Sequence, residues 1–146
     1  MLDIPVTSRF DFIICTEVFE HVPDPVALIE KLSDLTKSGG FILVTVPFLS
    51  LMHQSPYWFN SGLGPFWFEY WAEKLNLEIC ELEVSGDYID MMEQEVARLL
   101  NFKKPIPGIT RFSKLVKFCR LRLPKEVLES GGFGTLCVLR KKLNSK

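Results

Sequence analysis

The strongest hydrophobic pattern in the chain is a pair of apolar runs that flank an amphipathic segment. Phe10–Cys15 is short and rich in isoleucine and phenylalanine, which predicts a strand rather than a helix. Phe41–Val46 is apolar without alternation, which is typical of a strand covered on both faces. A helical connection between two such strands allows them to be parallel neighbours. The pattern therefore predicts a β-α-β unit.

The segment between these runs carries the start and stop signals of a helix. Asp24 can serve as the N-cap, and Pro25 suits the first helical position because its missing N–H needs no partner there. We expect Gly39 and Gly40 to end this helix. Its apolar face consists of Leu28, Ile29, Leu32 and Leu35.

A long loop from Pro47 to Gly64 follows the second strand and is rich in aromatic side chains. It leaves the carboxyl end of a predicted parallel strand, where open α/β sheets bind their ligands. We therefore expect this loop to be functional. A helix then begins at Pro65 and ends near Asn76, and apolar residues alternate with glutamates over 80–84, as in a half-exposed strand.

The last third of the chain predicts two helices and a final strand. Asp87 caps a helix that runs to about Asn101, and a second helix spans residues 111–123. The final strand is Phe133–Leu139. We expect one α/β domain over residues 1–146, with a helical, basic insertion at about 86–130. The apolar stripe predicted for the second helix consists of Leu115, Phe118, Cys119 and Arg122.

Composition agrees with a globular domain, since 47% of the 146 residues are hydrophobic and 24% are charged. The net charge is −1, but acidic residues gather between Glu69 and Glu95 and basic residues between Lys103 and Lys125. This basic segment can contact an acidic acceptor, a phospholipid surface or RNA, or it can simply be a solvated face. The residues expected at an anionic partner are Lys103, Lys104, Lys114, Lys117 and Arg120.

The four cysteines form no closely spaced pair, which argues against a zinc site. We expect reduced thiols in the core. The sequence contains no apolar stretch long enough to span a bilayer and no secretory leader, so a cytoplasmic location is expected.

The run FDFIICTEVFEHVPDP, followed by a helix and SGGFILVTVP, resembles the middle of the class I S-adenosylmethionine-dependent methyltransferases. The resemblance implies the second half of a Rossmann-like sheet, mostly parallel, flanked by helices, with the last strand antiparallel between two neighbours. The glycine-loop half of the domain is expected to be missing, so the chain is expected to be a truncated domain. The strand at Phe10–Cys15 would then expose an apolar edge, through which the chain can form a homo-oligomer.

The activity that this resemblance implies is methyl transfer from S-adenosylmethionine to a small-molecule or lipid-like acceptor. The alternative is a non-catalytic, truncated methyltransferase-like module that uses its open edge for association. The residues implied at the cofactor are Asp3, Ile4, Cys15, Thr16 and Glu17.

Glu20 and His21 are the candidate catalytic residues, because His21 can act as a general base. They can equally brace the corner by hydrogen bonding. His53, Tyr57 and Trp58 are the candidate substrate-binding residues, since the loop resembles the segment that borders the acceptor pocket in small-molecule methyltransferases.

The E-x-x-E-H corner also resembles the metal-binding corner of small-RNA 2′-O-methyltransferases, with His53 as the candidate for a distant ligand. The residues around His53 do not match that family's second histidine motif. A metal-dependent RNA 2′-O-methyltransferase-like function is therefore a second alternative, and we assign no metal ligand.

Overall fold

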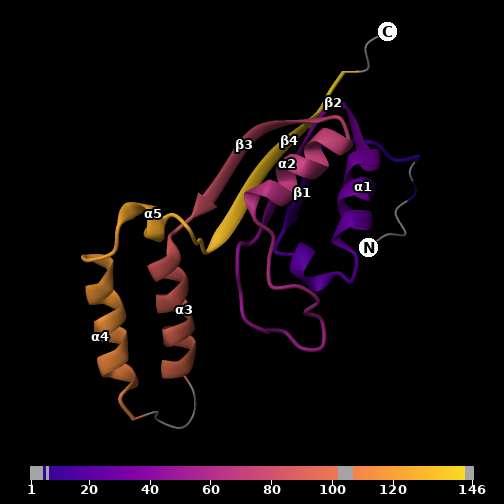
Figure 1. Ribbon diagram of the computed structural model, residues 1–146. Helices are drawn as coiled ribbons and strands as arrows, with labels where there is room; N and C mark the ends of the chain where they lie inside the picture. Colours follow the sequence, from indigo (N-terminus) through magenta and orange to yellow (C-terminus); the bar gives the residue numbers. More distant parts are fainter. Residues whose placement is uncertain (1–4, 6, 102–106, 144–146) are drawn as a thin grey trace.

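One mixed four-stranded sheet organises the chain, with strand order β1-β2-β4-β3 (Figure 1). The computed structural model describes residues 5, 7–101 and 107–143. β1 and β2 are parallel, and β4 is antiparallel to both of its neighbours, β2 and β3. The predicted α/β fold and its strand arrangement are therefore confirmed. The strands are β1 (Phe10–Thr16), β2 (Thr36–Pro47), β3 (Leu77–Ser85) and β4 (Gly134–Lys141).

Two helices, α1 (Pro25–Leu35) and α2 (Pro65–Lys74), contribute to the same apolar core as the sheet. The side chain of Asp24 accepts a hydrogen bond from the N–H of Ala27 at 2.9 Å, which confirms the predicted N-cap. The core-facing residues of β2 alternate with half-buried ones, so the predicted cover on both faces of this strand is wrong. The buried residues of β2 that join this core are Ile42, Val44 and Val46.

The end of α1 also differs from the prediction, because the helix stops at Leu35 and Gly39 and Gly40 lie inside β2. The hydroxyl of Thr36 donates to the carbonyl of Leu32 at 2.7 Å and so completes the last turn. The pairing register of β1 with β2 then shifts over residues 37–40. A Cβ atom at Gly40 would lie 2.9 Å from the Asp11 carbonyl oxygen, so these glycines serve a strand irregularity rather than a helix stop.

The sheet explains why the cysteines are not all core thiols. Cys15 and Cys137 are buried, Cys119 is half-buried and Cys80 is exposed. The register between β3 and β4 shifts between Ile79 and Glu81, which breaks the alternation expected over residues 80–84. The prediction of four core thiols is therefore wrong for Cys80.

Three helices lie between β3 and β4 and extend away from the sheet as an antiparallel hairpin with a short third helix (Figure 1). Asp87 and Asp90 form a reciprocal capping box at the start of α3, which confirms the predicted helix start. The hairpin has its own small core, built on Ile89, Val96 and Val116. The three helices are α3 (Tyr88–Leu100), α4 (Ile109–Arg120) and α5 (Lys125–Leu128).

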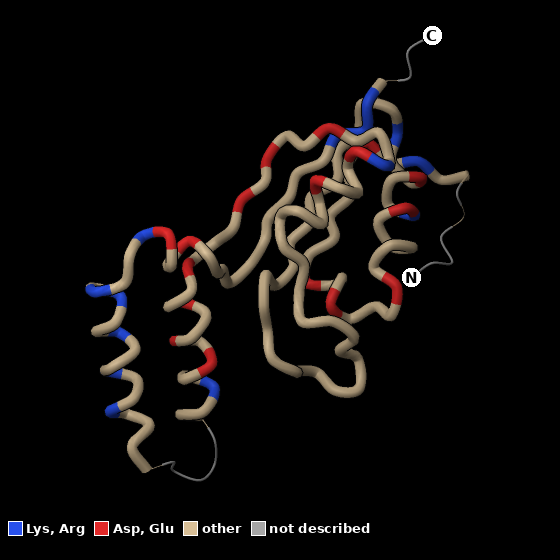
Figure 2. Tube along the Cα trace, in the orientation of Figure 1, with Lys and Arg blue, Asp and Glu red and all other residues tan. Residues whose placement is uncertain are grey.

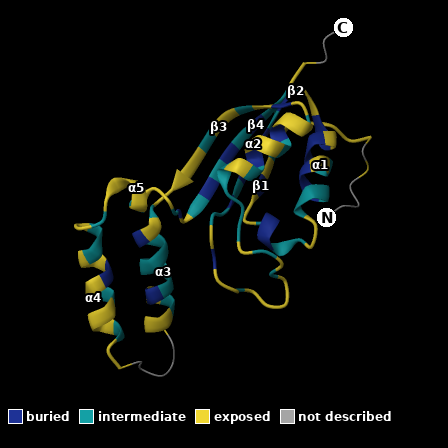
Figure 3. Ribbon diagram, viewed as in Figure 1, coloured by how far each residue is buried: buried dark blue, intermediate teal, exposed yellow. Residues whose placement is uncertain are grey.

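The predicted apolar stripe of α4 is correct for Cys119 and wrong for Leu115 and Phe118. Val116 and Cys119 pack in the core shared with α3, whereas Leu115 and Phe118 are about half exposed. Buried and exposed segments alternate along α4 (Figure 3). The sequence pattern could not distinguish them, because large apolar residues occur on both sides of this helix.

Acidic residues predominate on α3 and basic residues on α4 (Figure 2), and ion pairs connect the two helices. The Arg120 guanidinium bonds to the carboxylates of Asp87, at 2.5 Å, and Asp90. The Lys117 ammonium lies 3.9 Å from a Glu93 oxygen. Two of the residues expected at an anionic partner therefore bind carboxylates within the chain, and Lys103 and Lys104 lie outside the described residues.

β1 forms one edge of the sheet, as predicted, and three of its large apolar side chains face solvent. Phe10, Phe12 and Ile14 are 42%, 53% and 64% exposed. Within the described residues, no helix is both long enough and apolar enough to cross a membrane.

Candidate functional site

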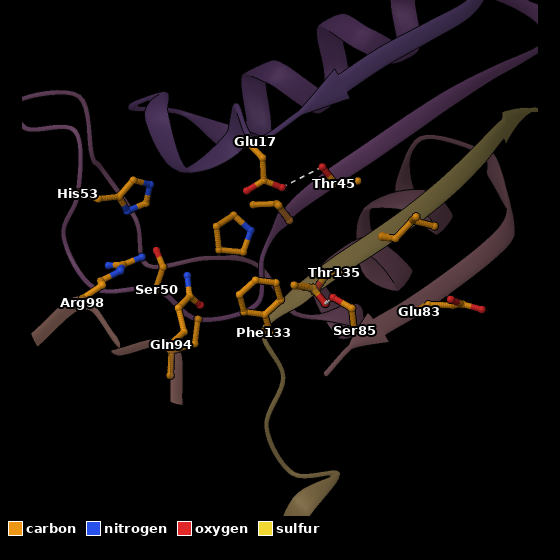
Figure 4. Close-up of a pocket in the computed structure, with 15 residues that line it drawn as sticks. Glu17, Thr45, Ser50, His53, Glu83, Ser85, Gln94, Arg98, Phe133 and Thr135 are labelled. Carbon is orange, nitrogen blue, oxygen red and sulfur yellow. Dashed lines mark hydrogen bonds between the residues drawn. The ribbon is translucent and has the colours of Figure 1, made fainter. Parts of the chain in front are cut away.

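A cavity of about 420 Å³ opens where the parallel strands β1 and β2 end (Figure 4). Its wall combines the ends of the strands with the loop after β2 and one side of α3. Ligands of open α/β sheets bind at this edge. The polar residues that line it include Glu17, Thr45, Ser50, His53, Gln94 and Arg98.

Glu17 follows β1 and is fixed by Thr45 of β2. The N–H of Glu17 donates to the Thr45 carbonyl at 2.8 Å, and the Thr45 hydroxyl donates to the Glu17 carboxylate at 2.9 Å (Figure 4). Glu17 has φ +51°, a left-handed conformation that non-glycine residues seldom adopt. The two hydrogen bonds therefore hold a carboxylate at the mouth of the cavity in one orientation.

The neighbouring cofactor candidates lie in different environments. Cys15 is buried in the core, and burial, followed by the charge of Glu20, raises its thiol pKa to about 11. Thr16 is exposed at the end of β1. Asp3 and Ile4 lie outside the described residues. Of the three candidates that the structure describes, Glu17 has the side chain that lines the cavity.

The candidate catalytic residues lie on a short 3-10 turn, η1 (Phe19–His21), which the core holds in place. Phe19 is fully buried, and its ring makes edge-to-face contacts with Trp67 and Phe68, at centroid distances of 5.7 and 6.2 Å. Glu20 follows it and is only 1% exposed. The apolar anchor thus draws a carboxylate into the protein interior.

The Glu20 carboxyl group is incompletely satisfied, because its Oε2 atom is buried without a hydrogen-bond partner among the described residues. Burial raises its pKa above the usual carboxyl value, and the negative charge of Glu17 adds to this shift. The hydrogen bond to its own backbone and the nearby His21 and His53 act in the opposite direction. A cation or a proton donor at this position would satisfy the group.

His21 and His53 face each other beside this carboxylate. Their ring centroids are 5.1 Å apart, and Nε2 of His21 lies 3.6 Å from Oε1 of Glu20. The Nδ1 atom of His21 contacts the Tyr57 carbonyl oxygen, and that of His53 lies 3.0 Å from the Leu51 carbonyl oxygen. Since a carbonyl can only accept, each Nδ1 donates its N–H to the carbonyl, so that in a neutral ring Nε2 is the nitrogen with the lone pair.

The loop after β2 is fastened to the η1 turn by its backbone. The N–H of Phe59 donates to the Glu20 carbonyl at 2.9 Å, and the Asn60 side-chain amide donates to the Phe19 carbonyl at 2.9 Å. These contacts bring His53 to His21 although 32 positions separate them in the sequence. The loop is therefore organised around the catalytic candidates.

Among the three substrate candidates, only His53 lines the described cavity. Tyr57 is 67% exposed and contributes its carbonyl group to His21 rather than its ring to the cavity. Trp58 is half-buried, with its indole N–H buried and without a partner among the described residues. The structure thus brings together Glu17, Glu20, His21 and His53 and leaves both aromatic rings outside the cavity wall.

Sequence reasoning missed the contribution of α3. Gln94 and Arg98 line the cavity, and a guanidinium nitrogen of Arg98 donates to the Leu51 carbonyl at 3.4 Å. Ser50 also lines it, with a buried hydroxyl that has no partner among the described residues. The helix itself was predicted, but its sequence carries no signal that it packs beside the loop after β2.

Comparison with known proteins agrees with this geometry. Residues 5–94 match the family model described as "Methyltransferase domain". The ubiquinone biosynthesis O-methyltransferase of Leptothrix cholodnii is 39% identical over 49 residues, which cover 34% of this chain and 19% of that protein. The enzyme of the same name from Xanthomonas oryzae is 42% identical over 50 residues. The matched segment is therefore about a fifth of the length of these relatives.

Solved structures share the fold at low sequence identity. An S-adenosylmethionine-dependent methyltransferase from Archaeoglobus fulgidus superposes with a TM-score of 0.53 at 15% identity, over 92% of this chain and 60% of that one. TehB from Haemophilus influenzae gives a TM-score of 0.51 at 15% identity, over 97% of this chain and 38% of that one. Because the family model covers residues 5–94, more than half of the sequence, the chain belongs to the methyltransferase-domain family, and its fold is that of the class I, S-adenosylmethionine-dependent methyltransferases.

Proposed function

We propose that this chain takes part in methyl transfer from S-adenosylmethionine to a small-molecule or lipid-like acceptor, at the cavity beyond β1 and β2. The observation that carries the proposal is the Glu17 carboxylate at the cavity mouth, which accepts a hydrogen bond from the Thr45 hydroxyl while the Glu17 N–H donates to the Thr45 carbonyl. Family membership supports the reaction class, and the names of the curated relatives support an O-linked acceptor.

The residues at the strand ends suit this cofactor. When bound, S-adenosylmethionine would supply a methyl group on a cationic sulfur. A nucleophile would attack the methyl carbon in line, and the sulfur would leave as a neutral thioether. Glu17 provides a fixed negative charge for the cationic or hydroxyl-bearing part of the molecule. Thr16 adds an exposed hydroxyl at the same strand end. Asp3 and Ile4 remain proposed contacts from the resemblance alone, and Cys15 can contribute only its backbone because its thiol is buried.

His21 is the proposed general base. Its Nδ1–H is held by the Tyr57 carbonyl, so Nε2 can accept a proton from an acceptor hydroxyl. The Glu20 carboxyl group lies 3.6 Å from the same Nε2 atom, where its negative charge would stabilise the imidazolium that forms. His53 is proposed to border the acceptor, since it belongs to both the cavity wall and the histidine pair.

Calorimetric titration of the 146-residue chain with S-adenosylmethionine tests this proposal. The variant Glu17→Gln should weaken binding roughly tenfold or more, because it removes one charged hydrogen-bond acceptor. Glu83→Gln is the matched control, since Glu83 is an exposed carboxylate on the β3 side of the same cavity. Equal affinities for the two variants, or no binding by the unchanged chain, would contradict the proposal.

A metal-assisted version of the reaction is a second candidate, favoured by the cluster of Glu20, His21 and His53. One possible ligand atom from each residue lies within 4.8 Å of the others. Two imidazole nitrogens and a carboxylate suit a divalent transition metal, and the carbonyl contacts of both Nδ1 atoms are the outer-shell hydrogen bonds that orient such ligands. Glu20 Oε2 is buried without a hydrogen-bond partner among the described residues, so a bound cation would compensate its desolvation.

A bound metal there would lower the pKa of an acceptor hydroxyl. Titration with Co²⁺, followed by its visible absorption, tests the site without requiring turnover. His53→Gln should abolish the absorption of the bound ion, and Gln54→His, one position along the same loop, should not restore it in that variant. An unchanged spectrum in His53→Gln would rule out this candidate.

We also infer that the open edge of β1 pairs with a second copy of the chain, as a non-catalytic association surface. Its exposed row of Phe10, Phe12 and Ile14 supports this assignment, because unpaired apolar edges associate. Sedimentation should detect a dimer that Ile14→Lys dissociates. A monomer at all concentrations would contradict it.

A further inference from the structure

The side of α4 that faces away from α3 is unusually apolar for an exposed surface. Three large side chains at intervals of three residues form one oblique row along it and are 50–79% exposed. Exposed apolar patches of this kind mark interaction sites rather than ordinary surface. We call them the α4 ridge, which consists of Leu115 and Phe118 within the helix and Leu121 at its C-cap.

The folded hairpin does not need this ridge. Val116 on the opposite side of α4 supplies the buried contact with Ile89 and Val96 of α3. Arg120 adds the ion pairs with Asp87 and Asp90. The hairpin extends beyond the end of the sheet, and the outer side of α4 carries exposed residues along its length (Figures 1 and 3). The ridge is therefore available to a partner.

The charges beside the ridge all have the same sign. The sequence between Asn101 and Lys125 contains no Asp or Glu. Basic residues recur along α4 (Figure 2). Arg111 and Lys114 are exposed and form no ion pair with any described residue, and the Arg122 guanidinium lies 5.1 Å from the centroid of the Phe118 ring. An apolar row bordered by unpaired cations complements a surface that is apolar inside and anionic outside.

We propose that the α4 ridge docks onto the surface of a lipid bilayer that contains anionic phospholipid. A helix in this position buries its Phe and Leu side chains at the boundary of head groups and acyl chains, while Arg and Lys remain among the phosphates. RNA fits less well, because Leu115 and Leu121 offer no ring on which a base can stack. This surface is separate from the cavity, so the proposal does not depend on methyl transfer.

Co-sedimentation of the full chain with large unilamellar vesicles tests the proposal. The chain should bind to vesicles of phosphatidylcholine and phosphatidylglycerol in a 7:3 ratio. It should bind much more weakly to vesicles of phosphatidylcholine alone. Replacing Arg111 and Lys114 with Gln should lower the partition coefficient about fivefold for each charge. Leu115→Ser together with Leu121→Ser should abolish binding at high salt, where the electrostatic part is screened.

Matched controls use exposed residues elsewhere on the chain. Lys142→Gln and Phe66→Ser remove an exposed cation and an exposed ring, the latter on α2, and should leave partitioning unchanged. Circular dichroism of every variant establishes that the helices are retained. The proposal is overturned if the unchanged chain does not bind anionic vesicles, or if the control variants reduce vesicle binding as much as the ridge variants do. It is also overturned if the ridge variants leave vesicle binding unchanged and instead abolish self-association or binding to an RNA oligonucleotide.

Discussion

Replacing Phe19 with leucine should destabilise the fold through the aromatic contacts that anchor the η1 turn. The side chain is 0% exposed, and its ring meets Trp67 and Phe68 edge to face. Leucine retains most of the apolar burial but loses both ring contacts, each of which contributes about 0.5–1.5 kcal/mol beyond burial. The free energy of unfolding should therefore fall by about 1–3 kcal/mol, against about 3–5 kcal/mol for Phe19→Ala, which also leaves a cavity.

Urea denaturation followed by circular dichroism measures this difference. Phe66→Leu is the matched control, because Phe66 lies on α2 beside Trp67 but is 81% exposed. It should change the stability by less than about 0.5 kcal/mol. Equal effects of the two substitutions, or no loss in Phe19→Leu, would refute the view that the aromatic cluster holds the η1 turn. The same loss of packing should lower the melting temperature by about 2–4 °C for each kcal/mol.

Three further substitutions test the fold and the electrostatics of the site. Asp24→Ala removes the N-cap of α1 and should cost about 1 kcal/mol in urea denaturation, and an unchanged midpoint would contradict the capping role. Gly40→Ala places a Cβ atom 2.9 Å from the Asp11 carbonyl oxygen and should cost about 1–3 kcal/mol, measured in the same way. The raised pKa of Glu20 means that the folded state binds its proton more tightly than the unfolded state does. The protonated Glu20 carboxyl group therefore contributes to stability below the ordinary carboxyl pKa, and this contribution is lost as the pH rises through the folded-state pKa. Glu20→Gln should therefore gain stability relative to the unchanged chain as the pH rises from 4 to 7, and parallel stability curves would contradict the burial argument.

The β-α-β unit could be predicted from the sequence because its signals are local. Asp24 and Pro25 mark the start of α1, and short, mainly apolar runs mark β1 and the second half of β2. The two glycines misled the prediction, because Gly39 and Gly40 are common helix-stop residues whose role here depends on the approach of β1. That approach is a tertiary contact, which no local pattern records.

The α3–α4 hairpin also shows that a local sequence pattern does not record tertiary contacts. Its helices and the cap at Asp87 were predicted, but the buried face of α4 was not, because Val116 and Phe118 are equally apolar in the sequence. The sequence showed that acidic and basic residues are segregated. Only the structure shows that the two groups pair with each other, through the ion pairs of Arg120 with Asp87 and Asp90. A run of basic residues in one helix can therefore form ion pairs with the neighbouring helix of the same chain rather than bind an external partner.

The candidate site was predictable where it follows a strand and not where distant segments converge. Glu17, Glu20 and His21 follow β1 directly, and the pattern of a strand followed by polar residues identified them. The approach of His53 depends on backbone hydrogen bonds from Phe59 and Asn60 to the η1 turn, which leave no trace in side-chain periodicity. The lining residues from α3 depend in turn on how the hairpin leaves β3.

Hydrogen exchange with mass spectrometry, in the presence and absence of S-adenosylmethionine, tests the central claim most directly, because it shows where a ligand protects the backbone. A cofactor bound beyond β1 and β2 should slow exchange in the peptides over residues 15–21 and 45–54, which carry Glu17, the η1 turn and His53. Peptides of α4 should exchange at unchanged rates. Protection confined to other segments, or no protection at cofactor concentrations that saturate the calorimetric signal, would contradict the assignment of this cavity as the methyltransferase site.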